Sequence, residues 1–298
     1  MSVTASLQLP ADVRNRLKGL RLLPQRAMGA HALGLHASRS RGSGLEFAQY
    51  RAYEPGDELR QVDWKLYARA DRFFVRESER ESPITVWLLL DSSASMQQAD
   101  QAQPQWRRWD AARALALCAA ELALAQGDRF GMAALGGHGL HLLPAAGGVR
   151  QRDLLRLRLS ALDAHGQWPQ AQAARPLWER VAAQDLVFAI GDGFEEGFVE
   201  LLTRLASARR EVVFAQLLSA EERDFPFTAG HRFIDPETGQ ELLGDGRALQ
   251  RDYLHRFAQA QQQLHARLHG AGVRMTTAYL DQPIDTALQA LYGVRGAA

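Results

Sequence analysis

The stretch "VWLLLDSSASM", residues 86–96, is an apolar run that stops at Asp91 and continues with Ser93 and Ser95 at alternate positions. A short apolar run bounded by small polar residues is typical of a strand buried on both faces of a sheet. In open α/β sheets, ligands bind outside the carboxyl ends of the strands. The stretch therefore predicts a central strand whose end carries a cluster of side-chain oxygen atoms.

Beyond this strand, short apolar runs alternate with amphipathic segments. The alternation predicts an α/β fold, with an open, mostly parallel, Rossmann-type sheet and helices on both faces. The expected strands are 85–91, 129–135, 140–144, 185–192, 211–218 and 273–280. The expected helices lie near 106–126, 151–163, 171–184, 196–209, 247–270 and 283–293. Two strand-like runs around an Asp-Pro-Glu-Thr-Gly turn predict an inserted hairpin at 231–244.

The pattern divides the chain into an N-terminal extension, residues 1–82, and a sheet domain, residues 83–298. The extension begins with one or two Arg-rich amphipathic helices within 5–26, and the first fifty residues carry seven Lys/Arg and two Asp/Glu. Such a basic helix is either a solvated face or a docking surface. Because the whole chain has a net charge of only +1, we expect no nucleic-acid partner.

Cys118 is the only cysteine in the 298 residues, which excludes an intrachain disulfide and a multi-cysteine metal site. Its place among apolar helix residues indicates a small buried side chain. No apolar run approaches the roughly 20 residues that span a bilayer, and the first residues lack the apolar core of a signal peptide. We therefore expect a cytoplasmic protein without a transmembrane segment.

A second carboxylate, Asp192 in "VFAIGD", ends a later predicted strand. If the two strands are neighbours, Asp91, Ser93, Ser95 and Asp192 lie over the same edge of the sheet. An all-oxygen set of this kind suits Mg²⁺ and leaves a coordination position that a partner's carboxylate can fill. The alternative is ordinary turn and N-cap chemistry, in which these side chains satisfy backbone N–H groups.

The segment 45–82, before the first strand of the sheet domain, is dense in arginine, acidic and aromatic residues. Asp57 as a cap, with Leu59, Val62 and Leu66 on one face, predicts a short helix in which Arg60 and Asp63 pair. The segment is a hydrogen-bonded clasp that packs the extension onto the sheet domain, with Trp64 as its anchor, or a partner surface, and the two interpretations are compatible. The candidate residues are Arg51, Tyr53, Asp57, Arg60, Asp63, Trp64 and Arg69.

Several enzyme motifs are absent from the sequence. It has no Gly-x-x-x-x-Gly-Lys-Ser/Thr loop, hence no ATPase site of its own, and no Gly-x-Ser-x-Gly nucleophile elbow. His265 and His269 are four residues apart but lack the glutamate of a zinc motif, so they indicate a polar helix face. The sequence therefore favours a protein that is not an enzyme.

Asp91-x-Ser93-x-Ser95 with a later strand-end Asp192 resembles the metal-ion-dependent adhesion site of von Willebrand factor type A domains. The preceding segment, 42–82, resembles the signature of the bacterial family called "domain of unknown function 58", as does "FIDPETG" at 233–239. The matching positions of the signature are Gly44, Glu46, Phe47, Arg51, Tyr53, Pro55, Gly56, Asp57, Arg60, Asp63, Trp64, Ala68, Arg69 and Glu77.

The resemblance implies a cofactor, Mg²⁺ or alternatively Mn²⁺ or Ca²⁺, held by Asp91, Ser93, Ser95 and Asp192. A-type domains usually add a threonine ligand, and the corresponding stretch 162–174 contains neither Thr nor Ser. Gln167 or water would have to replace that ligand, and the metal would bind weakly or be absent.

The resemblance also implies a non-enzymatic protein-binding module that acts as adaptor between a MoxR-type AAA+ ATPase and an unknown target protein. Two alternatives stay open at this point. One is a metal-dependent phosphohydrolase or phosphotransfer enzyme with Asp91 as nucleophile. The other is a scaffold whose metal site is vestigial.

Overall fold

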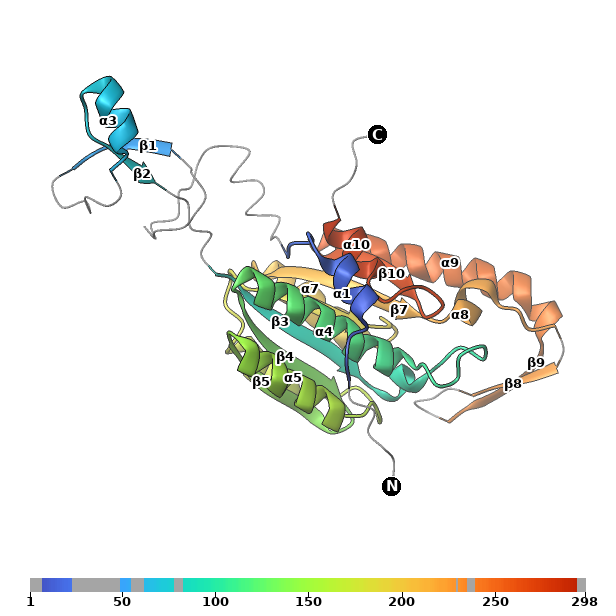
Figure 1. Cartoon of the computed structure of the whole chain (residues 1–298). Coiled ribbons are helices and arrows are strands. Elements are labelled where there is room, and N and C mark those ends of the chain that lie inside the picture. Colours follow the sequence, from blue (N-terminus) through green and yellow to red (C-terminus); the bar gives the residue numbers. More distant parts are fainter. Residues whose placement is uncertain are drawn as a thin grey trace. The chain divides into compact units, whose positions relative to one another are not determined.

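A six-stranded sheet is the centre of the larger of two units in the chain (Figure 1). The computed structural model describes residues 7–22, 49–54, 62–77, 83–228, 230–234 and 239–293. The larger unit comprises Met1–Pro24 and Ile84–Ala298, and the smaller unit is Gln25–Pro83. The boundary predicted after residue 82 lies close to Ile84, where the second segment of the larger unit begins. Residues 1–24, however, group with the sheet and not with the segment that follows them.

The strand order of the sheet is β10-β7-β6-β3-β4-β5. The strands are β3 (Thr85–Ser92), β4 (Arg129–Gly136), β5 (Gly139–Ala146), β6 (Leu186–Gly191), β7 (Glu211–Leu218) and β10 (Arg274–Tyr279). All neighbours pair in parallel except β4 and β5, which form an antiparallel edge. The chain runs from β3 outward to β5 and then returns to β6 on the other side of β3. The order of strands therefore reverses beside β3, where this class of sheet places its ligand sites.

Strand β3 is buried on both faces, which explains its continuous apolar sequence. Leu88 and Leu90 point into the cluster that contains the long helix α4 (Arg108–Gln126). Trp87 and Leu89 point into the cluster on the opposite face. The predicted α/β fold, with a mostly parallel sheet between helices, is confirmed.

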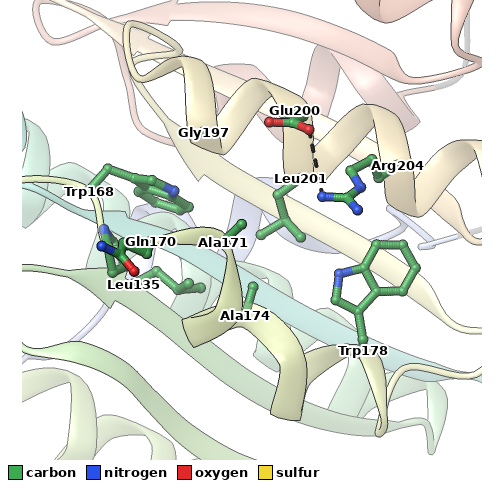
Figure 2. A pocket seen from close by; sticks show the side chains of 11 residues that line it. Leu135, Trp168, Gln170, Ala171, Ala174, Trp178, Gly197, Glu200, Leu201 and Arg204 are labelled. Carbon is green, nitrogen blue, oxygen red and sulfur yellow. Dashed lines mark ion pairs between the residues drawn. The ribbon is translucent and has the colours of Figure 1, made fainter.

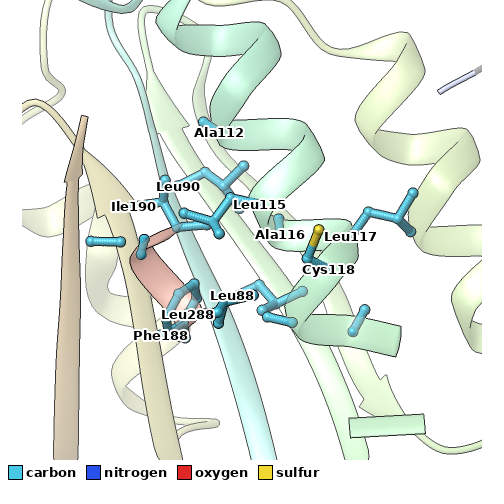
Figure 3. Close-up of a cluster of buried hydrophobic side chains, with 14 of the residues drawn as sticks. Leu88, Leu90, Ala112, Leu115, Ala116, Leu117, Cys118, Phe188, Ile190 and Leu288 are labelled. Atoms are coloured by element: carbon cyan, nitrogen blue, oxygen red, sulfur yellow. The ribbon is translucent and has the colours of Figure 1, made fainter. Parts of the chain in front are cut away.

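Helices cover both faces of the sheet (Figure 1). The first face carries α1 (Ala11–Leu17), α4, α5 (Val149–Ala161) and α10 (Thr286–Tyr292). The second face carries η3 (Ala171–Ala174), α6 (Arg175–Trp178), α7 (Glu196–Ser207) and α9 (Gly246–Gly270). Figure 3 shows side chains of α4 packed against the first face of the sheet, among them Cys118, which is fully buried. The predicted burial of Cys118 is confirmed.

The continuous helix expected over 171–184 is wrong, because only the short elements η3 and α6 form there. Asp185 explains why the chain turns instead. Its Oδ2 accepts hydrogen bonds from the Ala182 backbone N–H at 2.8 Å and from Trp87 Nε1 at 3.0 Å. These bonds hold the segment before β6 against β3 as a turn.

The N-terminal helix α1 is shorter than the one or two helices expected within 5–26, although part of that range lies outside the described residues. It ends at Leu17, before Gly19, which has a positive φ of 89°. The side chains of Val13, Leu17 and Leu22 are buried in the same cluster as α4. This apolar burial makes α1 part of the sheet domain.

The smaller unit contains β1 (Gln49–Ala52), α3 (Trp64–Ala70) and β2 (Phe74–Glu77), and its two strands pair in antiparallel fashion. Of the helix expected from Asp57 to Leu66, the described part is helical only from Trp64, where α3 begins. Val62 pairs with Val75 beside β2, and Asp63 caps α3 by accepting the Lys65 and Leu66 N–H groups at 3.0 Å. The first part of that predicted helix, including Asp57 and Arg60, lies outside the described residues.

The hairpin expected at 231–244 is formed by β8 (Gly230–Ile234) and β9 (Glu241–Asp245), which follow the short helix α8 (Ala220–Asp224). Its strands pair from Gly230 opposite Asp245 to Ile234 opposite Glu241. Among the helices in the described part of the chain, none is long and apolar enough to cross a bilayer.

Candidate functional site

Asp91 and Asp192 lie at the carboxyl ends of two neighbouring strands, as the sequence predicts. Strands β3 and β6 pair up to Leu90 opposite Ile190, so Asp91 follows on one strand as Gly191 follows on the other. The two strands are so close there that a Cβ atom on Gly191 would lie 2.9 Å from the Asp91 Cβ. Both carboxylates are fully buried. The strand reversal beside β3 therefore collects two acidic groups at one point.

The two serines form a tight turn after β3. The Asp91 Oδ1 accepts a hydrogen bond from the Ser93 backbone N–H at 2.9 Å, and the hydroxyl oxygens of Ser93 and Ser95 are 3.1 Å apart. Both serine side chains are buried, and Ser93 precedes the short helix η2 (Ala94–Gln97). The turn chemistry left open by the sequence is thus present, and it brings the serines next to Asp91.

The Asp192 loop is fixed from two directions. Its Oδ1 accepts a hydrogen bond from the Phe194 backbone N–H at 3.0 Å. Its backbone carbonyl accepts one from the buried Gln216 Nε2 at 2.8 Å, and the Gln216 Oε1 accepts one from the Thr277 hydroxyl at 3.0 Å. Gln216 therefore connects the position of Asp192 to the strands β7 and β10.

A buried arginine completes the site. Arg108, the first residue of α4, has only 2% of its side chain exposed. Its Nη1 donates to the Asp192 Oδ2 at 3.0 Å and to the Ser95 backbone oxygen at 3.2 Å. Its Nη2 forms an ion pair with Glu222 of α8, and its guanidinium lies over the Phe194 ring, 5.4 Å from the ring centre.

These contacts fit a divalent cation poorly. Both carboxylate oxygens of Asp192 already have donors, the Phe194 N–H and the Arg108 guanidinium. The loop that should supply a further ligand does reach the serine turn, because the Ala94 N–H donates to the Gly166 carbonyl at 2.8 Å. Gln167, the next residue, is exposed. Within the described ranges, no three His, Cys, Asp or Glu side chains form a group that could hold a metal.

The candidate residues of the smaller unit are only partly described. Asp57 and Arg60 lie outside the described residues, and Arg51 belongs to β1, opposite Val75. Asp63 caps α3 through its side chain, and Arg69 lies in the last turn of that helix.

Aromatic rings gather on the smaller unit around Phe73. Tyr67 stacks on Phe73 with ring centres 4.4 Å apart, and the Tyr53 ring lies 6.1 Å from Phe73. Trp64 contacts both Tyr67 and Phe73 edge-on, yet 57% of it remains exposed. The structure therefore assigns Trp64 to an aromatic surface within its own unit, and its role as an anchor for the sheet domain stays a prediction.

A pocket of about 150 Å³ lies between η3, α6 and α7 (Figure 2). Trp168 and Trp178 line it together with Glu200 and Arg204, which form an ion pair 3.6 Å apart. A cavity of this size accommodates a group of about the size of a benzene ring. It is a surface feature, and its size does not indicate a cofactor site.

Sequence reasoning did not find Arg108, Gln216, Phe194 or Glu222. For Arg108, a signal was present in "QWRRWDAARA", where two arginines begin a helix. Positive charges are unfavourable at the N-terminus of a helix because of the helix dipole. Two of them there indicate that a nearby negative group, in this case Asp192 for Arg108, compensates for that cost.

A family model described as "Protein of unknown function DUF58" matches residues 49–264. Curated relatives include uncharacterized proteins of Mycobacterium bovis and of Mycobacterium tuberculosis, each 31% identical over 157 residues. The match covers 53% of this chain and 47% of each relative, so the chain spans about half the length of the curated relatives that it matches.

Similar solved structures include the conserved hypothetical protein BatB from Bacteroides thetaiotaomicron, at 16% identity and a TM-score of 0.42, covering 70% of this chain and 95% of that one. The SpRpn10 VWA domain matches at 11% identity and a TM-score of 0.42, covering 73% and 99%. Because these TM-scores are low, the α/β assignment comes from the order and pairing of the strands themselves.

Proposed function

Since the chain belongs to the DUF58 family and the reversal of strand order in its sheet lies beside β3, we propose that it is a non-enzymatic protein-binding module of the von Willebrand factor A type. Its binding surface is the edge of the sheet at the carboxyl ends of β3 and β6. The buried residues Asp91, Ser93, Ser95 and Asp192 shape this edge from inside, and the partner contacts the side chains that cover them.

The observation that supports this surface is the placement of Phe194. Half of this aromatic side chain is exposed, two residues after the fully buried Asp192. Its backbone is fixed by the hydrogen bond to Asp192, and its ring lies over the buried Arg108 guanidinium. A rigid, exposed aromatic ring costs little conformational entropy on binding, and such rings are enriched at the energetic centres of protein interfaces.

The partner that the family resemblance implies is a MoxR-type AAA+ ATPase. In this proposal, the chain acts as an adaptor between that ATPase and a target protein. Because the sequence has no nucleotide-binding loop, the energy for remodelling the target would come from the ATPase. The aromatic surface of the smaller unit, around Trp64 and Phe73, is available for a second contact.

The proposal is tested by affinity capture from native lysate with tagged variants. We expect Phe194→Ala to lose the captured ATPase, at least tenfold by quantitative mass spectrometry, because it removes an exposed aromatic contact. The matched control is Leu157→Ala, since Leu157 of α5 is 66% exposed on the same unit but belongs to a different surface. Equal capture by wild type and Phe194→Ala would refute the proposed surface.

An Asp91→Ala variant in the same capture tests whether the buried residues shape the edge. We expect its capture to fall as well, because the Ser93 N–H loses its acceptor and the turn relaxes. Parallel captures in Mg²⁺ and in EDTA separate a metal-dependent contact from a metal-independent one.

The scaffold alternative and the enzyme alternative differ in their support. A scaffold with a vestigial metal site is favoured by the ion pair between Arg108 and Asp192, which occupies one of the expected ligands. For a phosphotransfer enzyme, the described residues offer no supporting contact, since the Asp91 carboxylate is fully buried and its Oδ1 is held by Ser93. Phosphoester hydrolysis by the wild type that is lost in Asp91→Asn would support the enzyme hypothesis instead.

A further inference from the structure

The ion pair between Arg108 and Asp192 is buried on both sides. Arg108 has 2% of its side chain exposed and Asp192 has none. Removing a charge from water is unfavourable, and a protein retains such a charge only where partners compensate for it. The Nη1 of Arg108 donates to the carboxylate of Asp192 and to the backbone oxygen of Ser95, and its Nη2 forms an ion pair with the carboxylate of Glu222.

The partners of Arg108 come from separate elements. Ser95 belongs to the turn after β3, Asp192 follows β6, and Glu222 lies in α8. A single rigid guanidinium, with its donors in a plane, therefore holds together the two strand-end loops and the start of the segment that leads to the hairpin. A divalent cation between the same loops would also hold them together, through oxygen ligands.

We propose that Arg108 is the resident cation of this site and takes the place of the divalent metal that the family resemblance implies. The site is therefore complete without metal, and it offers no open coordination position to a partner's carboxylate. This inference goes beyond the proposed function, because it concerns the charge inside the edge and holds whichever partner binds there.

A consequence is that a metal site should appear when Arg108 is removed. Without the guanidinium, the Asp192 Oδ2 loses its donor, and Asp91 lies on the adjacent strand with the serine hydroxyls beside it. Two carboxylates and two hydroxyls are the ligands that hard divalent cations prefer. Arg108→Ala should thus convert a metal-independent site into one that binds Mn²⁺ or Mg²⁺.

Thermal unfolding in EDTA and in millimolar MnCl₂ tests this conversion. We expect the Tm of the wild type to be the same in both solutions. Arg108→Ala should lose roughly 10 °C in EDTA, because it leaves a buried carboxylate without its partner, and should regain several degrees in MnCl₂. The double variant Arg108→Ala/Asp192→Asn should lack the response to MnCl₂.

Arg113→Ala is the matched control, since Arg113 lies on the same helix and is also mostly covered, but pairs with Asp110. Its Tm should be the same in EDTA and MnCl₂. Two results would overturn the inference. The first is a Tm that rises in MnCl₂ for the wild type but not for Asp192→Asn. The second is an Arg108→Ala variant that unfolds cooperatively and has the same Tm in EDTA and in MnCl₂.

If Arg108→Ala does not fold, electron paramagnetic resonance of Mn²⁺ titrated into the wild type decides instead. Mn²⁺ that remains free supports Arg108 as the resident cation. One tightly bound Mn²⁺ per chain, absent from Asp192→Asn, would contradict it. None of these readouts depends on capture of a partner, so their failure is distinguishable from failure of the proposed function.

Discussion

Arg16 and Asp285, which are 269 residues apart in the chain, form a two-pronged ion pair. The Nη2 of Arg16 lies 2.8 Å from the Asp285 Oδ1, and its Nε lies 2.9 Å from the Oδ2. Asp285 is almost fully buried at the start of α10, whereas 43% of the Arg16 side chain is exposed. The pair joins the N-terminal helix α1 to the last helix of the sheet domain.

Removing Arg16 should therefore destabilise the domain more than removing the charge of Asp285. In Arg16→Ala, a buried carboxylate loses its guanidinium partner and bears the cost of desolvation. In Asp285→Asn, the exposed guanidinium of Arg16 can be solvated by water. We expect the Tm by circular dichroism at pH 7 to fall by several degrees in Arg16→Ala and by less in Asp285→Asn.

The double variant Arg16→Ala/Asp285→Asn provides the check on this explanation. It should recover part of the stability lost in Arg16→Ala, since no unpaired buried charge remains. Arg14→Ala, on an exposed position of the same helix, should leave the Tm unchanged. A double variant that is less stable than Arg16→Ala would show that the pair acts by some means other than charge compensation.

The parts of the fold that the sequence predicts are those controlled by local pattern. The apolar run 86–90 before Asp91, and the run before Asp192, indicate strands buried on both faces, and the parallel sheet then brings the two carboxyl ends together. The prediction of a helix over 171–184 was wrong because Asp185 accepts a hydrogen bond from Trp87, 98 residues away. A helical sequence pattern contains no information about such a distant contact.

The part of the site that the sequence does not predict depends on long-range pairing. Arg108 lies between Arg107 and Trp109 at the start of a helix, and only the fold brings it to Asp192, 84 residues later. Ligand spacing alone predicts a metal centre at Asp91 and Asp192, and it gives no sign of the guanidinium that pairs with Asp192. A basic residue in the first turn of the helix that follows an Asp-x-Ser-x-Ser turn is a pattern to check before a metal is assigned.

Asp100 gives the domain a specific pH dependence. This carboxyl is 4% exposed, and burial raises its pKa despite the hydrogen bond that its Oδ1 accepts from the Ala220 N–H at 2.8 Å. The nearby Asp281 and Glu222 raise the pKa further. Because the pKa is higher in the folded state than in the unfolded state, the ionised carboxylate opposes folding at neutral pH, and this cost disappears as the pH falls through the folded-state pKa.

Asp100→Asn should therefore raise the Tm at pH 7, since it keeps an oxygen acceptor for Ala220 and removes the charge. The gain over the wild type should shrink as the pH falls toward 3.8, the ordinary value for an aspartate. Tm measurements across this pH range check the sign. Asp252→Asn, at an exposed position of α9, should give no comparable gain. A lower Tm for Asp100→Asn at pH 7 would contradict the argument.

Gly191, the last residue of β6, sets how closely the two acidic strand ends approach each other. A Cβ atom on Gly191 would lie 2.9 Å from the Asp91 Cβ and 3.1 Å from the Phe198 ring. Asp91 and Phe198 are both fully buried, so neither can move aside without disturbing the core. We expect Gly191→Ala to lower the free energy of unfolding by about 1–3 kcal/mol, as overpacking of a dense core does.

The same substitution should also weaken partner capture, because it pushes Asp91 away from the serine turn that its carboxylate holds. Urea unfolding measures the first effect and affinity capture the second. Gly270→Ala is the matched control: an added Cβ there meets no atom within 4 Å, and alanine is a better helix former at this last residue of α9. If Gly191→Ala were as stable as the wild type and captured partners equally, the close contact between β6 and Asp91 would have no role in shaping the edge.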